Sequence, residues 1–135
     1  MALPDGWAGS VVNAIVEGQA GVKDLGSGFD RVAISPRWAA SGDKSAQIRV
    51  RYPASVGYVA YNYDYDEATR RLHVKATSSA SETFFSVLLP SGRTVSNALV
   101  NRRVATVRIE KVENSIYAHI EIVNKGPQEI ELELL

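Results

Sequence analysis

The chain has 135 residues, 45% of them hydrophobic, and its fifteen Lys and Arg residues are balanced by fifteen Asp and Glu residues. This length suits one domain with its own core, and the balanced charge, with no run of either sign, argues against a nucleic-acid or anionic-membrane partner. No stretch of eighteen apolar residues occurs, which excludes a membrane-spanning helix. The absence of cysteine excludes disulfides, thiolate nucleophiles and cysteine-ligated metals and leaves the cellular compartment open.

The first predicted element is a short amphipathic helix over residues 7–17, followed by Gly18 as a stop signal. Its apolar residues recur at spacings of three and four, as on one face of a helix. Several β-branched valines lower its intrinsic stability, so it is expected to depend on tertiary contacts. Because the rest of the chain has a strand pattern, we expect Trp7, Val12 and Ile15 to dock on the sheets or on a partner surface.

From residue 29 onwards, apolar and polar residues alternate with the period of two that is typical of β-strands. The best example is a hairpin, in which two such segments flank a short polar turn. The predicted strands are residues 29–35, 46–52, 56–65, 70–77, 82–89, 94–100, 104–112, 115–123 and 128–134. Eight or nine strands, spaced by about ten residues, predict a mainly β fold, either an antiparallel sandwich or a barrel. We therefore expect one domain over residues 1–135, with a helical segment at 1–18 and the β domain at 29–135.

Acidic and imidazole side chains are the first candidates for catalysis. Asp64, Asp66 and Glu67 lie close together near the hairpin turn, and a glycosidase needs two carboxyl groups about 5–9.5 Å apart. We favour the alternative that they stabilise the turn, because Asp side chains bond to the local backbone. His73 and His119 fall in the middle of strands on predicted solvent faces, so we interpret both as surface histidines rather than as metal or acid/base groups.

Other polar residues also lack a catalytic pattern. Glu129, Glu131 and Glu133 share one face of the last strand, which we interpret as a solvated surface that discourages self-association. No serine lies in a Gly-x-Ser-x-Gly motif, and the glycines follow a helix and precede a strand, the reverse of the order in phosphate-binding loops. The sequence therefore predicts no catalytic residue, no metal site and no cofactor.

Aromatic residues are the main candidates for a binding surface. Tyr58, Tyr61, Tyr63 and Tyr65 fall in one predicted strand, and the last three share a face. Tyrosines on a sheet can hold sugar rings, but aromatic residues also pack well in cores and at interfaces, and we favour packing. Trp38 has the same two interpretations, contact with a carbohydrate or packing at the core or a domain interface.

Four stretches of the sequence resemble a known family. They are NAIVEGQAGVKD at residues 13–24, GFDRVAISPRW at 28–38, the hairpin of residues 52–74 with GYVAYNY and RLHV, and VLLPSG at 87–92. They resemble the junction between the helical toroid and the C-terminal β-sandwich of large bacterial glycosidases and sugar phosphorylases, most closely the α-L-rhamnosidase type. These are packing and turn motifs, and residues 104–134 have no counterpart in the family pattern.

The resemblance implies a non-catalytic accessory domain, because the acid and base carboxylates of such enzymes belong to the toroid, which these residues lack. No catalytic position carries over. The expectation is an antiparallel β-sandwich with one N-terminal helix, partnered by the catalytic helical-toroid domain or by another copy of the chain. The alternative is an independent carbohydrate-binding module that uses the tyrosine-rich strand. A third hypothesis is a small enzyme that uses Asp64 or Glu67.

Overall fold

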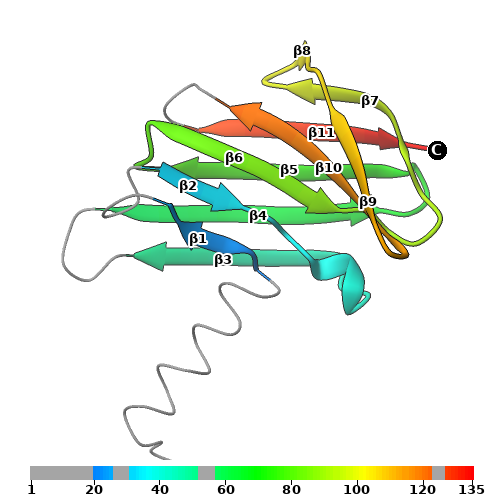
Figure 1. Ribbon diagram of the computed structural model, residues 1–135, viewed down its shortest axis with the longest axis horizontal. Helices are drawn as coiled ribbons and strands as arrows, with labels where there is room; N and C mark the ends of the chain where they lie inside the picture. The colour runs from blue at the N-terminus through cyan, green and yellow to red at the C-terminus, as the bar shows by residue number, and fades with distance from the viewer. Residues whose placement is uncertain (1–19, 26–30, 52–56, 123–126) are drawn as a thin grey trace, which may run out of the picture.

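The structure, a computed structural model, describes residues 20–25, 31–51, 57–122 and 127–135 (Figure 1). The strands in these ranges are β1 Val22–Asp24, β2 Arg31–Ile34, β3 Ser45–Arg51, β4 Tyr58–Asp66, β5 Arg71–Ser78, β6 Glu82–Leu88, β7 Val95–Val100, β8 Arg103–Val104, β9 Arg108–Val112, β10 Ser115–Ile122 and β11 Gln128–Leu134. Within the same ranges the one helical element is the 3-10 turn Trp38–Ala40, and no helix is long and apolar enough to cross a membrane. The helix predicted at residues 7–17, with Trp7, Val12 and Ile15 as docking residues, lies outside the described residues.

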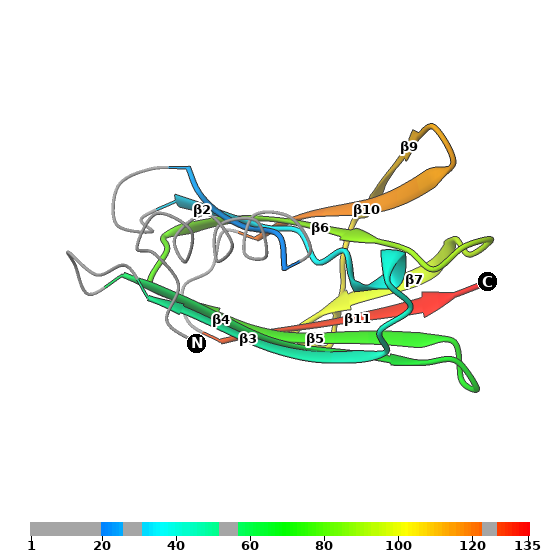
Figure 2. The same ribbon diagram turned by 90° about the horizontal axis from the view of Figure 1, so that it is seen from below.

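The strands form two sheets that face each other as two layers (Figure 2). The five-stranded sheet has the order β1-β2-β6-β10-β9, and the six-stranded sheet has the order β3-β4-β5-β11-β7-β8. The prediction of a mainly β, sandwich-like fold is confirmed. One correction concerns strand direction, because β2 and β6 pair in parallel while the other described pairs are antiparallel. Strands β3, β4 and β5 belong to the other sheet and return the chain to the end of the sandwich at which β2 began.

The core lies between the two sheets and is built by strand alternation. In β4 and β11, and in β5 as far as Ala76, every second residue is buried, and the residues between them are exposed or half-buried. Their buried side chains meet those of β2, β6 and β10 from the opposite layer in one cluster. The most deeply buried members of this core include Val32, Val59, Leu72, Val74, Val87, Ala118, Ile130 and Leu132. The period of two in the sequence thus corresponds to the division between core and surface.

Among the described residues, two strand assignments differ from the prediction by more than a shift of the ends. The segment predicted as one strand at residues 104–112 is two strands, since β8 pairs with β7 in one sheet and β9 pairs with β10 in the other. The chain crosses from one layer to the other between these strands. Apolar and polar residues continue to alternate through the crossing, so the sequence pattern does not reveal it. The three-residue strand β1, which pairs with β2, was not predicted because it is too short to show alternation.

Candidate functional site

The tyrosines predicted as a binding platform or as core divide between the inside and the outside of the sandwich. Tyr61 and Tyr63 are each 2% exposed and Tyr65 is also buried, so the face that they share points toward the other sheet. Tyr58, on the opposite face of β4, is 37% exposed. Burial therefore assigns Tyr61, Tyr63 and Tyr65 to the core, which is the packing alternative. Tyr58 and the half-buried Trp38 are the members of the predicted set that reach the surface.

The tyrosine hydroxyls inside the core differ in their hydrogen bonding. The Tyr61 hydroxyl accepts a hydrogen bond of 2.9 Å from Trp38 Nε1 and donates one of 2.6 Å to the carbonyl oxygen of Ala20. The buried Tyr63 hydroxyl has no hydrogen-bond partner among the residues that the structure describes. Burial raises the pKa of Tyr61, and it raises the pKa of Tyr63 to about 12. Both phenols are thus neutral, structural groups near neutral pH.

The acidic hairpin has the arrangement of a stabilised turn. Asp66 Oδ1 accepts hydrogen bonds from the backbone N–H groups of Ala68, at 3.0 Å, and Thr69, at 3.3 Å. The ammonium group of Lys44 lies 2.7 Å from Glu67 Oε2 and, by donating this hydrogen bond, holds the pKa of Glu67 below its ordinary value. The general acid of a glycosidase needs a raised pKa. The contacts of Asp66 confirm its predicted role in the turn, and the environment of Glu67 is opposite to that of a general acid.

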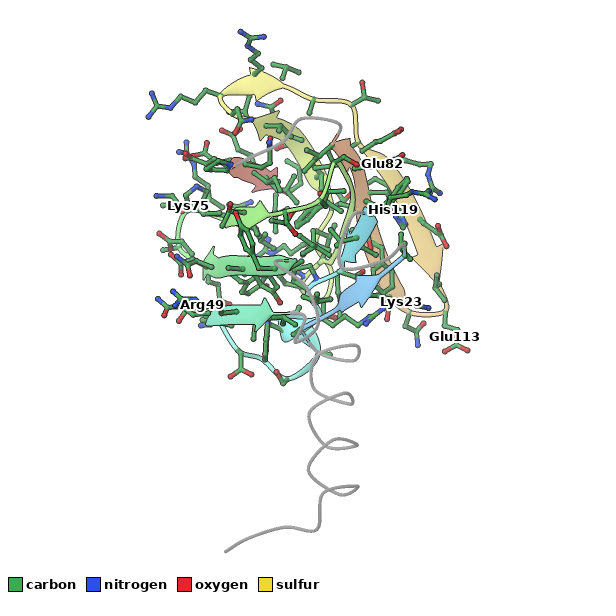
Figure 3. All side chains as sticks on the ribbon, turned by 90° about the vertical axis from the view of Figure 1, so that its left-hand side faces the viewer. Lys23, Arg49, Lys75, Glu82, Glu113 and His119 are labelled. Atoms are coloured by element: carbon green, nitrogen blue, oxygen red, sulfur yellow. The ribbon has the colours of Figure 1, made fainter. Side chains whose placement is uncertain are left out.

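The two histidines lie on opposite outer faces of the sandwich. His73 shares a face of β5 with Lys75, two residues further on, and Figure 3 shows Lys75 on the side of the molecule away from His119 of β10. His119 is half-buried, and its Nε2 lies 3.1 Å from Glu110 Oε2. The same oxygen of Glu110 accepts a hydrogen bond from Arg108, also at 3.1 Å. Although His119 Nε2 is close to this carboxylate, it is buried and makes no hydrogen bond with any described residue, so Glu110 is hydrogen-bonded to Arg108 and only adjacent to the imidazole.

His73 lies between carboxylates on the outer face of the six-stranded sheet. Its Nε2 is 3.0 Å from Glu129 Oε1 and 3.8 Å from Glu131 Oε1. The hydrogen bond with His73 lowers the pKa of Glu129. The prediction that His73 is on an outer face is confirmed, but its carboxylate neighbours were missed because the pairing of β5 with β11 joins residues 56 positions apart.

A depression of about 700 Å³ lies on the outer face of the five-stranded sheet. Phe84 of β6 is directly opposite Ala33 on one side and Glu121 on the other, and Ser86 is opposite His119. All five residues line the depression, where Phe84 remains exposed. It therefore combines one exposed aromatic ring with hydroxyl, imidazole and carboxylate groups. The depression is not evident from the sequence, because pairing between distant strands brings these residues together.

The chain is similar to known proteins in fold but not in sequence. No model of a known protein family matches the sequence, and no curated protein matches it. The α-L-rhamnosidase from Dictyoglumus thermophilum superposes with a TM-score of 0.57 and 18% identity, over 93% of this chain and 14% of that one. The uncharacterized protein lmo2446 from Listeria monocytogenes EGD-e superposes with a TM-score of 0.52 and 13% identity, over 76% of this chain and 10% of that one.

The α-1,4-glucan lyase from Gracilariopsis lemaneiformis superposes with a TM-score of 0.50 and 12% identity, over 80% of this chain and 14% of that one. The chain thus spans 10–14% of the length of these proteins. In fold, it resembles one part of these much larger proteins, two of which are named as an α-L-rhamnosidase and an α-1,4-glucan lyase.

Proposed function

We propose that this chain is a non-catalytic accessory β-sandwich domain of a carbohydrate-active enzyme of the α-L-rhamnosidase type. The observation that carries the proposal is the asymmetry of the fold likeness, which covers 93% of this chain and 14% of the rhamnosidase. Such an arrangement is that of a domain attached to a much larger chain. The sequence resemblance at residues 13–24 and 28–38 supports the same enzyme type.

The acidic groups of the hairpin also support a non-catalytic role. Glu67 is held in its charged form by Lys44, and Asp66 uses its carboxylate to bond the turn backbone. Neither environment favours the protonated carboxyl group that glycoside cleavage requires. In the enzyme that we propose, the acid and the base come from the catalytic domain.

The proposed partner is the catalytic helical-toroid domain, with another copy of the chain as the alternative. Strands β8 and β9 expose the apolar side chains of Val104, Ile109 and Val112. Exposed apolar residues that gather in one segment are typical of surfaces that contact another domain. These strands are edge strands of the two sheets, and we propose that they contribute to the contact with the partner.

Glycoside hydrolysis by the purified chain tests the non-catalytic assignment. With p-nitrophenyl α-L-rhamnoside and p-nitrophenyl α-glucoside as substrates, we expect release of p-nitrophenol no faster than in buffer. The variants Asp64→Asn and Glu67→Gln should give the same result. Hydrolysis by the wild-type chain that disappears in either variant would contradict the proposal and support the small-enzyme hypothesis.

A second candidate function is a carbohydrate-binding module that uses the outer face of the five-stranded sheet. The depression beside Phe84 favours it, because an exposed ring can stack on a sugar while neighbouring polar groups accept and donate hydrogen bonds. This surface differs from the predicted tyrosine strand, most of which is buried.

Calorimetric titration with rhamnose-containing oligosaccharides and with α-1,4-glucan oligosaccharides separates the two functions. The accessory-domain proposal predicts no binding heat. Binding that is lost in Phe84→Ala and kept in Tyr58→Ala, an exposed aromatic residue on the other sheet, would instead establish the binding module.

A further inference from the structure

We infer that His73, Glu129 and Glu131 form a binding site for a first-row divalent metal ion of the Zn²⁺ type. One ligand atom from each residue can be chosen so that the three atoms all lie within 4.8 Å of one another. The imidazole Nε2 is 3.0 Å and 3.8 Å from the two carboxylate oxygens. In a tetrahedral zinc site with bonds near 2.1 Å, neighbouring ligand atoms are about 3.4 Å apart. The observed separations lie on either side of this value.

The backbone holds these three side chains, which we call the β5–β11 cluster, on rigid neighbouring strands. Strands β5 and β11 are in the interior of the six-stranded sheet, with β4 on one side and β7 on the other. Glu131 is directly opposite His73, and Glu129 is two residues along the same face of β11. On the inner face the same strands bury Leu72 and Ile130 completely. Ligands fixed on packed strands lose little conformational freedom when an ion binds.

The charges around the β5–β11 cluster favour a dication. Asp64 of β4 is directly opposite His73 on the side away from β11, so a third carboxylate shares this part of the face. Lys75, opposite Glu129 on β5, and Arg102 are the cations that act on Glu129, while Arg71, two residues from His73, pairs with Glu133 at 3.6 Å. Three carboxylates around one imidazole and these two cations leave one negative charge that a divalent ion would balance.

The donor set selects the class of ion. An imidazole nitrogen with two carboxylate oxygens suits Zn²⁺ and its first-row neighbours, whereas Mg²⁺ and Ca²⁺ prefer sites built wholly from oxygen. The three side chains are half-buried, which leaves solvent access for water as a further ligand. Because His73 and Glu129 are 56 positions apart and meet through strand pairing, the bound ion would also stabilise the folded chain.

Calorimetric titration of the whole chain with ZnCl₂ at neutral pH tests the inference. We expect one ion per chain, with the dissociation constant raised at least tenfold in His73→Ala and in Glu131→Gln. The control is His119→Ala, which removes the other half-buried histidine, one that also lies beside a glutamate but on the opposite sheet. This variant should bind Zn²⁺ as the wild type does, and MgCl₂ should give no binding heat.

Thermal unfolding gives a second readout that does not depend on binding heat. Zn²⁺ should raise the unfolding temperature of the wild type and of His119→Ala, and it should have no such effect on Glu129→Gln, which keeps the size of the side chain. Absence of Zn²⁺ binding to the wild type, unchanged affinity in His73→Ala, or an equal loss in His119→Ala would each overturn the inference.

Discussion

Tyr61 and Tyr63 occupy similar positions on one strand face, but their hydroxyls differ in hydrogen bonding. Both side chains are 2% exposed. The Tyr61 hydroxyl bridges Trp38 and Ala20, whereas the Tyr63 hydroxyl is without a partner in the described part of the chain. A buried polar group stabilises a fold only when its hydrogen bonds are made.

This difference predicts that the two tyrosine-to-phenylalanine variants behave differently. Tyr61→Phe should lower the free energy of unfolding by about 1–3 kcal/mol, because the Ala20 carbonyl and the Trp38 N–H lose their partner. Tyr63→Phe should be neutral or should stabilise the protein by up to about 1 kcal/mol, because it removes an unpaired hydroxyl. Urea unfolding monitored by circular dichroism measures both, and an equal loss in the two variants would refute this explanation.

The raised pKa of Tyr63 predicts a loss of stability at alkaline pH. An unfolded tyrosine has a pKa near 10, and the folded-state pKa of Tyr63 is about 12. The folded chain holds this proton more tightly than the unfolded chain does. The free energy of unfolding is therefore unaffected by Tyr63 titration below pH 10, and it falls as the pH rises from 10 toward 12. The slope is about 1.4 kcal/mol per pH unit in this window. Unfolding measured across the window should show a smaller slope in Tyr63→Phe, and an unchanged slope would contradict the assignment.

Gly21 and Gly42 separate two reasons for a glycine, which are a close approach of another backbone segment and an unusual backbone angle. Gly21 and Gly42 both have positive φ, at +70° and +77°. A Cβ at Gly21 would lie 1.8 Å from the carbonyl oxygen of Ser35, whereas a Cβ at Gly42 would meet nothing within 4 Å. Gly42→Ala should therefore cost about 1–2 kcal/mol from the backbone angle. Gly21→Ala should cost at least about 3 kcal/mol, because the backbone must also move. Comparable losses in urea unfolding would show that the close approach is unimportant.

At the scale of elements, alternation predicted the strands that bury one face. The hairpin was predicted at residues 56–65 and 70–77 and is observed at Tyr58–Asp66 and Arg71–Ser78. Local sequence carries this information because each core-facing residue must be apolar. Strand pairing is not local, so the parallel β2–β6 contact and the crossing between β8 and β9 could not be predicted.

The same limit applies to the candidate sites. The shared face of Tyr61 and Tyr63 was predicted correctly, but whether a second sheet covers it depends on residues far along the chain. The Phe84 depression and the β5–β11 cluster each combine strands that are distant in sequence. Only the contacts of Asp66 with the neighbouring turn residues were accessible from local sequence.

Substitutions in the interior strand β11 and in the edge strand β8 should have very different effects on the free energy of unfolding. It lies between β5 and β7, and the side chain of Leu132 is completely buried in the core. Leu132→Ala should lower the free energy of unfolding by about 2–5 kcal/mol, because it leaves a cavity between the sheets. Val104→Ala, at a position that is 79% exposed on β8, should change it by less than about 0.5 kcal/mol. A thermal unfolding series checks both, and a small effect at Leu132 would show that β11 is not central to the core.

At the scale of the whole molecule, the two sheets present different outer faces. The five-stranded sheet carries the depression beside Phe84, and the six-stranded sheet carries the β5–β11 cluster. Because the sandwich core separates these faces, substitutions on one should leave the other unchanged. The glycan-binding and metal-binding hypotheses can therefore be tested independently of each other.

The central claim is that this domain serves a larger carbohydrate-active enzyme. Immunoprecipitation from extracts of the source cells, with an antibody raised against the purified chain, tests this claim most directly. We predict that the antibody removes a glycoside-cleaving activity from the extract, together with a polypeptide or complex much larger than the 14.7 kDa of this chain. Recovery of a free 14.7 kDa protein, with the activity left in the extract, would contradict it.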